Sequence, residues 1–345
     1  MQGWSSLKII VGAGAGIIGF AAAASAQSVE TFYKDKIVEM VVGSDAATEY
    51  TRDARMVAQT LPKYIPGRPT IIVKNMPGAS GLTAANYLYQ IAAKDGSVLG
   101  VFNKAIPMAE ATNLQGVRYK SAEFNWLGSM NRTNSLVVTW KTSGVETLED
   151  ARKREVTIGA QGLSGTMATY PFLLNNSQGT RFKVIAGYQG SAAVNLAMER
   201  GEVEGRGTYS WDFFKSDHQD WKTNKKMHFL VQIGIEKEAD LPDVPLLTDL
   251  AKDDTQRAVY RLISADSMIA RPFITTPGVP AERVAALRQA FDKTMVDADF
   301  LRDAEKSHSN VAPVSGEKLA AIVKLMIDTP PAIVEQANQW MSSPK

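Results

Sequence analysis

The sequence contains no cysteine among its 345 residues. Disulfide bonds, thiolate metal sites, cysteine nucleophiles and a lipid-modified N-terminal cysteine are therefore excluded. Histidine is scarce as well, with three residues, and neither a His-Glu-x-x-His zinc motif nor a Gly-x-Ser-x-Gly nucleophile elbow occurs. The residue types thus give little support to metal-dependent or Ser-His hydrolytic chemistry, and we expect no metal and no cofactor.

An excess of charge of either sign is also missing. Lys and Arg total 38 against 36 Asp and Glu, a formal net charge of +2. This balance argues against a nucleic-acid-binding protein, which usually carries a basic excess or patch. Hydrophobic residues make up 45% and charged residues 21%, a composition typical of globular proteins and too apolar for a disordered chain. The length suggests two domains of ordinary size.

Long apolar runs are confined to the N-terminal region. Lys8 precedes an apolar stretch over Ile9–Ala24, which leads into the small residues Ser25 and Ala26. A basic start, an apolar middle and a small-x-small exit are typical of a secretory signal peptide. We therefore predict a signal peptide over residues 1–26, cleavage after Ala26 and export to the periplasm. An uncleaved membrane anchor is the alternative reading of the same stretch.

After this region, short apolar runs alternate with segments of helical periodicity. The predicted strands are Ile37–Val42, Thr70–Val73, Val98–Phe102, Val156–Ile158, Lys183–Ile185 and Phe229–Ile233. The predicted helices are Tyr50–Leu61, Leu82–Ala93, Thr166–Leu174 and Ser191–Arg200, followed by four C-terminal helices between Ala281 and Trp340. Alternating strands and helices indicate an α/β fold with parallel sheets that are covered on both faces.

The strand–helix units fall into two sets, which predicts two lobes with a ligand cleft between them. Trp126–Met130, Val137–Trp140 and Met268–Ile274 lie outside the two sets, so we read them as crossings between the lobes. Lobe 1 is then 27–131 and 267–345, and lobe 2 is 132–266. In this arrangement the C-terminal helices pack back on the first lobe, and the protein is expected to be a monomer.

Four loops between a strand and the next helix are candidates for ligand binding, because ligands of open α/β sheets sit at the carboxyl ends of strands. Three of the loops are rich in Gly and hydroxyl residues, which lets an anion approach the free amides of a helix start. Simple helix capping by Ser and Thr is the alternative. The candidate residues are Ser44, Ala47, Thr48 and Glu49; Pro77, Gly78, Ala79, Ser80 and Gly81; Gln161, Ser164, Gly165 and Thr166; and Tyr188, Gly190 and Ser191.

One arginine stands apart from the other charged residues. Arg206 lies between Gly205 and Gly207, after the short run Glu202-Val203-Glu204. We read it as an arginine at the end of a strand, where a guanidinium can bind a carboxylate through two hydrogen bonds. The alternatives are a surface arginine or an ion pair with Glu202 or Glu204.

Several stretches together resemble a known family. They are Val73-Lys74-Asn75-Met76-Pro77-Gly78-Ala79-Ser80-Gly81 with the following Ala84-Ala85-Asn86-Tyr87-Leu88 and Asp95-Gly96; Tyr188-Gln189-Gly190-Ser191 with Gly201-Glu202-Val203-Glu204; Leu241-Pro242-Asp243-Val244-Pro245; and Arg271-Pro272-Phe273 with Pro277-Gly278-Val279-Pro280-Ala281-Glu282-Arg283-Val284. In order and spacing the chain resembles, from Val29 to Trp340, the extracytoplasmic solute receptors of tripartite tricarboxylate transporters, the Bug or TctC-type proteins.

The resemblance implies a two-lobed periplasmic binding protein, not an enzyme, that closes on a small organic anion and delivers it to the membrane permease subunits of the transporter. The same resemblance places the ligand contacts in the four loops. A secreted hydrolase or lyase using the same cleft, or a solute sensor for a membrane signalling protein, are the alternatives. Nucleic acid is not expected as a partner.

The first loop departs from the family pattern, which has a proline and then glycines before an acidic residue. This chain has Ala46, then Ala47, Thr48 and Glu49 in place of the glycines. Glu49 adds a negative charge where an anion should approach, which leaves the charge of the solute open. Two arrangements are possible: Glu49 pairs with Arg206 across the closed cleft, or Glu49 faces solvent and Arg206 binds the carboxylate directly. The second is the one we favour.

Overall fold

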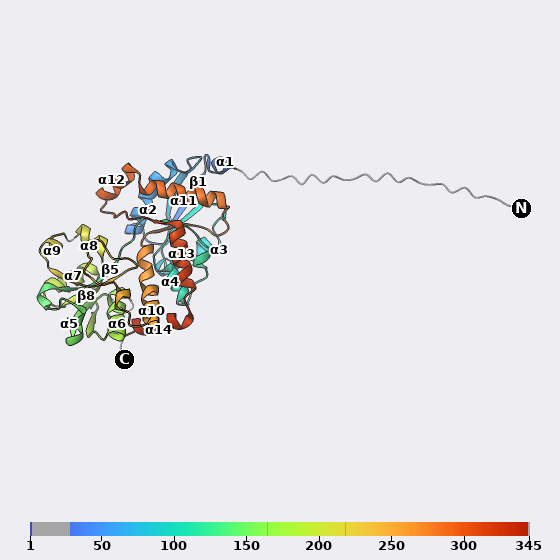
Figure 1. Ribbon diagram of the computed structural model, residues 1–345. Coiled ribbons are helices and arrows are strands. Elements are labelled where there is room, and N and C mark those ends of the chain that lie inside the picture. The colour runs from blue at the N-terminus through green and yellow to red at the C-terminus, as the bar shows by residue number, and fades with distance from the viewer. Residues whose placement is uncertain (2–27, 164, 218, 344–345) are drawn as a thin grey trace.

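The computed structural model describes residue 1 and residues 28–163, 165–217 and 219–343. Apart from Met1, the predicted signal peptide lies outside the described residues. The remaining chain forms two sheets with helices around each, one sheet in each lobe (Figure 1). The predicted α/β architecture with two lobes is thereby confirmed. Among the described residues, no helix combines the length and the apolar character needed to cross a membrane.

The sheet of the first lobe has six strands in the order β11-β4-β10-β3-β1-β2. Their bounds are β1 Ile37–Val42, β2 Thr70–Asn75, β3 Val98–Val101, β4 Asn125–Ser129, β10 Pro272–Thr275 and β11 Val314–Ser315. The helices of this part of the chain are α1 Val29–Tyr33, α2 Glu49–Thr60, α3 Leu82–Gln90, α4 Ile106–Ala111, α11 Ala281–Met295, α12 Ala298–Lys306 and α13 Gly316–Ile327. β3 and β10 are buried along their whole length and β1 over most of it, so these strands are largely apolar.

The sheet of the second lobe has five strands in the order β7-β6-β8-β5-β9. Their bounds are β5 Ser135–Trp140, β6 Val156–Ala160, β7 Phe182–Ala186, β8 Gly205–Ser210 and β9 Met227–Ile233. Its helices are α5 Leu148–Lys153, α6 Thr166–Gln178, α7 Ser191–Glu199, α8 Trp211–Asp217 and α9 Gln219–Thr223. The six strands predicted from apolar runs all exist, with ends displaced by two residues at most.

The expectation of purely parallel sheets is wrong for both lobes. β10 runs antiparallel to β3 and β4, and β5 runs antiparallel to β8 and β9. The reason is the path of the chain, because β5 and β10 each follow a crossing and enter their sheet from the other lobe. The strands joined through helices, such as β1 with β2 and β6 with β7, are parallel as predicted.

Two segments carry the chain between the lobes, and they lie side by side. The first joins β4 to β5, and the second runs from the short helix η6 Ala265–Ile269 into β10. Backbone hydrogen bonds tie them together: the Met130 amide donates to the Arg271 carbonyl and the Thr133 amide to the Ser267 carbonyl, each at 3.0 Å. Paired crossings of this kind provide a natural hinge axis.

The C-terminal helices divide between the lobes, whereas the sequence analysis placed all of them on the first lobe. α11 and α13 pack on β4 and α12 packs on α2, as predicted for the first lobe. α14 (Pro331–Met341) instead packs on α6 and on α10 (Asp254–Ser264), a helix that the sequence reading missed. Trp340 holds α14 in this position. Its ring lies 6.1 Å from that of Tyr260, and its carbonyl accepts a 2.9 Å hydrogen bond from Asn176 Nδ2. The residue-level lobe boundaries stay a prediction.

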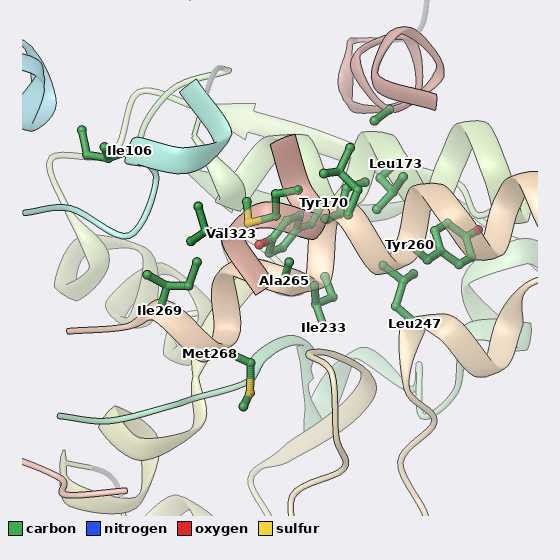
Figure 2. Close-up of a cluster of buried hydrophobic side chains, with 14 of the residues drawn as sticks. Ile106, Tyr170, Leu173, Ile233, Leu247, Tyr260, Ala265, Met268, Ile269 and Val323 are labelled. Carbon is green, nitrogen blue, oxygen red and sulfur yellow. The ribbon is translucent and has the colours of Figure 1, made fainter. Parts of the chain in front are cut away.

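A buried apolar cluster continues from one lobe into the other behind the crossings. Figure 2 shows Ile106 of α4 and Val323 of α13 together with Tyr170 and Leu173 of α6. The second crossing adds three members of the same cluster, which are Ala265, Met268 and Ile269. All of these side chains are buried, so packing of this cluster holds the two lobes together.

Candidate functional site

A cavity with a volume of about 750 Å³ lies between the lobes. Both lobes and both crossings contribute to its wall. The polar and charged residues that line it include Glu49, Arg52, Asp53 and Lys104 from the first lobe, Asn131, Thr133, Ser135 and Arg271 from the crossings, and Thr166, Ser191, Arg206, Thr208, Ser210, Asp212 and Lys215 from the second lobe. Such a volume suits a small organic molecule.

Arg206 reaches this cavity from near the start of β8, which corrects the reading of an arginine at the end of a strand. The β5–β8 register shifts beside it, so the strand is locally irregular there. The Arg206 Nε donates a 2.8 Å hydrogen bond to the Thr208 carbonyl two residues further on. The guanidinium is therefore bent along the strand toward its carboxyl end, where ligands of α/β sheets bind.

The remaining guanidinium nitrogens are held by neutral groups. Arg206 Nη1 donates to Asn195 Oδ1 at 2.5 Å and Nη2 to Ser191 Oγ at 3.3 Å, and the guanidinium carbon lies 4.4 Å from the centre of the Tyr209 ring. Both helix α7 and strand β8 thus orient this side chain. The arrangement leaves the positive charge without a negative partner.

The burial of Arg206 excludes the two alternatives considered from the sequence. The residue is 4% exposed, so it is not a surface arginine. Glu204 pairs with Arg154 at 2.7 Å and Glu202 with Arg200 at 3.8 Å, so neither glutamate neutralises it. Among the described residues, no carboxylate lies within 4.0 Å of its nitrogens. Burial lowers the pKa of the Arg206 guanidinium to about 10, which leaves it charged at neutral pH.

The glycines beside Arg206 serve packing and not access of a ligand. A Cβ atom at Gly205 would collide with the Val138 carbonyl oxygen, and one at Gly207 would collide with the Met167 carbonyl oxygen and Pro171. Both positions therefore need glycine because neighbouring backbone comes too close for a side chain.

Glu49 follows neither of the two arrangements considered from the sequence. Its carboxylate pairs with Arg271, which also binds Asp53 through Nε at 2.9 Å. The Arg271 guanidinium lies over the Tyr50 ring at 4.4 Å. Burial lowers the pKa of Arg271, but Tyr50, Asp53 and Glu49 together outweigh this effect and raise it. Glu49 is thus paired with Arg271 and does not neutralise the charge of Arg206.

A second ion pair joins the first lobe to the second crossing. Lys104, which follows β3, lies 3.0 Å from Asp266 of η6. Burial lowers the pKa of the Lys104 ammonium, but Asp266 and Tyr170 outweigh it, so the pKa is raised and the lysine stays charged. Five lysine and arginine side chains therefore line the cavity. Four of them have a carboxylate within 4.0 Å, namely Arg52, Lys104, Lys215 and Arg271, whereas Arg206 has none among the described residues.

Apart from Glu49, the predicted residues of the first two candidate loops do not line the large cavity. The Ser44 and Thr48 hydroxyls bond each other at 2.7 Å, and Thr48 caps α2 by accepting from the Thr51 amide. The capping alternative therefore describes this loop. Pro77, Gly78, Gly81 and Ser44 line a separate cavity of about 220 Å³ beside Tyr50.

The third and fourth loops open toward the large cavity. α6 begins after Gly165 and α7 after Gly190, and neither helix start has a side-chain cap among the described residues. Thr166 and Ser191 line the cavity at these two starts. The first amides of both helices thus have no side-chain acceptor among the described residues.

Not every predicted residue lines a cavity. Ala47, Thr48, Ala79, Gln161, Gly165, Tyr188 and Gly190 line neither of the two. Ser164 lies outside the described residues, and the side chain of Ser80 is likewise not described. The predicted set therefore divides into Glu49, Thr166, Ser191 and Arg206 at the large cavity and Ser44, Pro77, Gly78 and Gly81 at the small one.

The polar residues of the large cavity that the sequence reading missed include Lys104, Asn131, Asp212 and Arg271. Lys104 and Asp212 carried a usable signal, because they lie three and two residues after the ends of β3 and β8. Asn131 and Arg271 belong to the crossings, which were read as connections. Within the described part of the chain, no group of three or more His, Asp and Glu side chains is placed to hold a metal ion.

The sequence matches no protein-family profile and no curated protein. Solved structures do match over most of their length. A TctC solute binding protein from Polaromonas has 19% identity and a TM-score of 0.70, with 88% of this chain and 99% of that chain covered. Periplasmic binding protein BugD has 16% identity and a TM-score of 0.57, with coverage of 89% and 98%. MatC from Rhodopseudomonas palustris with bound malate has 17% identity and a TM-score of 0.56, with coverage of 87% and 99%. The predicted resemblance is confirmed as a shared fold.

Proposed function

We propose that this protein is a periplasmic solute-binding receptor that captures a small carboxylate in the cavity between its lobes. Closure of the lobes about the paired crossings then buries the solute. The closed receptor delivers it to the permease subunits of a tripartite tricarboxylate-type transporter. The fold shared with TctC and Bug proteins supports this role, and malate in the MatC structure supports an organic acid as the solute.

The observation that carries the proposal is the unneutralised Arg206 in the cavity wall. A guanidinium that is 4% exposed and has no carboxylate partner nearby is costly to bury. A carboxylate solute would supply the missing charge and accept hydrogen bonds from Arg206. The uncapped starts of α6 and α7 would add backbone amides to the same anion.

An enzyme using the same cleft is less well supported. A hydrolase needs a nucleophile within hydrogen-bond reach of a base. His308 lines the cavity, but among the described residues no hydrogen bond joins it to a serine or threonine hydroxyl there. A sensor role shares the binding step. Recovery of the protein with permease subunits, as opposed to a signalling receptor, from solubilised membranes would favour transport.

The first test is a thermal-shift screen of the full chain against mono-, di- and tricarboxylates. We expect at least one acid to raise the melting temperature by several degrees, because a ligand at 100 times its dissociation constant adds about 2.7 kcal/mol of stability. The matched control is the neutral amide of the same acid, which keeps the shape and removes the charge. An equal shift by acid and amide, or no shift by any acid, would contradict carboxylate recognition.

A further inference from the structure

A group of hydrogen-bonding side chains lies in the same cavity as Arg206, where the first crossing meets the start of α8. We name this group the crossing cluster and define it as Asn131, Thr133, Ser210 and Asp212. The Asp212 carboxylate accepts from the Thr133 hydroxyl at 2.6 Å, from the Ser210 hydroxyl and from Asn131 Nδ2 at 3.1 Å. All four residues line the cavity.

The Asp212 charge has no cationic partner. Among the described residues, no lysine, arginine or histidine nitrogen lies within 4.0 Å of its carboxylate. Lys215, one turn along α8, pairs with Asp240 at 3.8 Å, while Lys104 and Arg271 have the partners described above. The three bonds from neutral donors leave room for one more, because a carboxylate offers about four acceptor positions.

Asn131 adds a second, independent sign of a missing donor. The residue is 4% exposed, and its Oδ1 is a buried acceptor without a hydrogen-bond partner among the described atoms. Its Nδ2 is committed to Asp212, which fixes the orientation of the amide. Buried acceptors without a donor are rare in folded proteins, and each one calls for a physical explanation such as strain, a functional role or a bound donor.

The cavity therefore has two poles of opposite character. Arg206, on β8, is a cation without an anion, and Asp212, on the helix that directly follows β8, is an anion without a cation. A simple carboxylate satisfies only the first pole. A ligand that satisfies both must carry a donor-rich, positively charged group in addition to its carboxylate.

We infer that the solute is an amino-acid-like zwitterion whose ammonium group binds Asp212 and Asn131 while its carboxylate binds Arg206. This inference rests on the proposed function and narrows it to one chemical class. An ammonium suits the crossing cluster because it has three N–H donors and no acceptor. A hydroxyl would leave the Asp212 charge unneutralised.

Matched ligands that differ at one group test the inference by titration calorimetry of the full chain at pH 7. The probes are succinate, malate and aspartate, and butyrate, 2-aminobutyrate and 4-aminobutyrate. We expect at least one amino acid to bind at least tenfold more tightly than its unsubstituted acid, because a hydrogen bond to a charged group contributes about 1.5–3 kcal/mol. Malate is expected to resemble succinate.

Substitutions assign the preference to the crossing cluster. Asp212→Asn is nearly isosteric and is expected to reduce the preference for the amino acid at least tenfold while leaving the affinity for the unsubstituted acid unchanged or improved. Asn131→Ala should also reduce the ratio of the affinity for the amino acid to that for the unsubstituted acid. It is the variant to use if Asp212→Asn does not fold. The matched control is Asp299→Asn, because Asp299 is an exposed carboxylate on α12 away from the cavity.

The outcomes separate the two proposals. Equal binding of amino and unsubstituted acids, or a preference for malate over both, overturns the zwitterion and leaves the carboxylate receptor standing. An amino-acid preference that persists in both Asp212→Asn and Asn131→Ala overturns the role of the crossing cluster. Failure of every probe to bind overturns the carboxylate site as well as the zwitterion.

Discussion

Replacing Arg206 by methionine is expected to weaken carboxylate binding on the order of 100-fold or more, because removing one partner of a buried charge pair costs 2–5 kcal/mol or more. Methionine keeps much of the length of the side chain and leaves no charge to compensate. The hydrogen bonds that are lost go to Asn195, Ser191 and a backbone carbonyl, all of which are neutral. The measurement is the dissociation constant of the best acid from the thermal-shift screen.

Arg200→Met is the matched control for this prediction. Arg200 caps the C-terminal end of α7 in the same lobe. Its side chain is 62% exposed, and its ion pair with Glu202, at 3.8 Å, is exposed as well. We expect its affinity to equal that of the unmodified protein. Arg206→Lys should lie between the two, because lysine restores a charge without the planar fork of guanidinium. Undiminished affinity in a folded Arg206→Met protein would show that the carboxylate binds elsewhere.

Replacing Arg271 by methionine is expected to lower the free energy of unfolding by about 3–5 kcal/mol, because it leaves a buried carboxylate without its partner. That carboxylate is Asp53, which is 3% exposed and keeps only the 2.7 Å bond from Ser309 and a 3.5 Å contact with Arg52 as close polar interactions. Glu49 is less affected, since half of its side chain is exposed. Denaturant unfolding monitored by circular dichroism provides the measurement.

Two further variants check the cause of this loss. Arg302→Met breaks an exposed ion pair with Asp299 on α12 and should leave the stability nearly unchanged, because solvent screens such a pair. Glu49→Gln should cost about 1 kcal/mol or less, because its partner Arg271 keeps Asp53. A loss for Arg271→Met no larger than that of Arg302→Met would show that this group does not hold the α2 start to the second crossing.

Much of the fold could be predicted because its signals are local. The runs at Ile37–Val42 and Val98–Phe102 are apolar since both faces of these strands are covered, and such runs are visible in the sequence. The direction of β10 could not be predicted, because it depends on which lobe the chain comes from. The position of α14 depends in the same way on a contact between Trp340 and Tyr260, far apart in the chain.

The candidate site was predictable only in part, for a similar reason. Arg206 was predicted as a ligand-binding residue partly because glycines flank it, although these glycines are required for close packing. The partner of Glu49 could not be identified, because Arg271 lies 222 residues further along the chain and only the fold brings it near. Asn131 and Asp212 are polar residues without a motif, and they become recognisable as a cluster only through the crossing that joins them.

The most direct measurement of the central claim is a crystal structure of the full chain with the acid that binds most tightly in the thermal-shift screen. The account predicts closed lobes and a carboxylate of that acid within hydrogen-bond distance of the Arg206 guanidinium, close to the starts of α6 and α7. A carboxylate bound instead in the small cavity beside Gly78 and Tyr50, with Arg206 left without an anion, would contradict it.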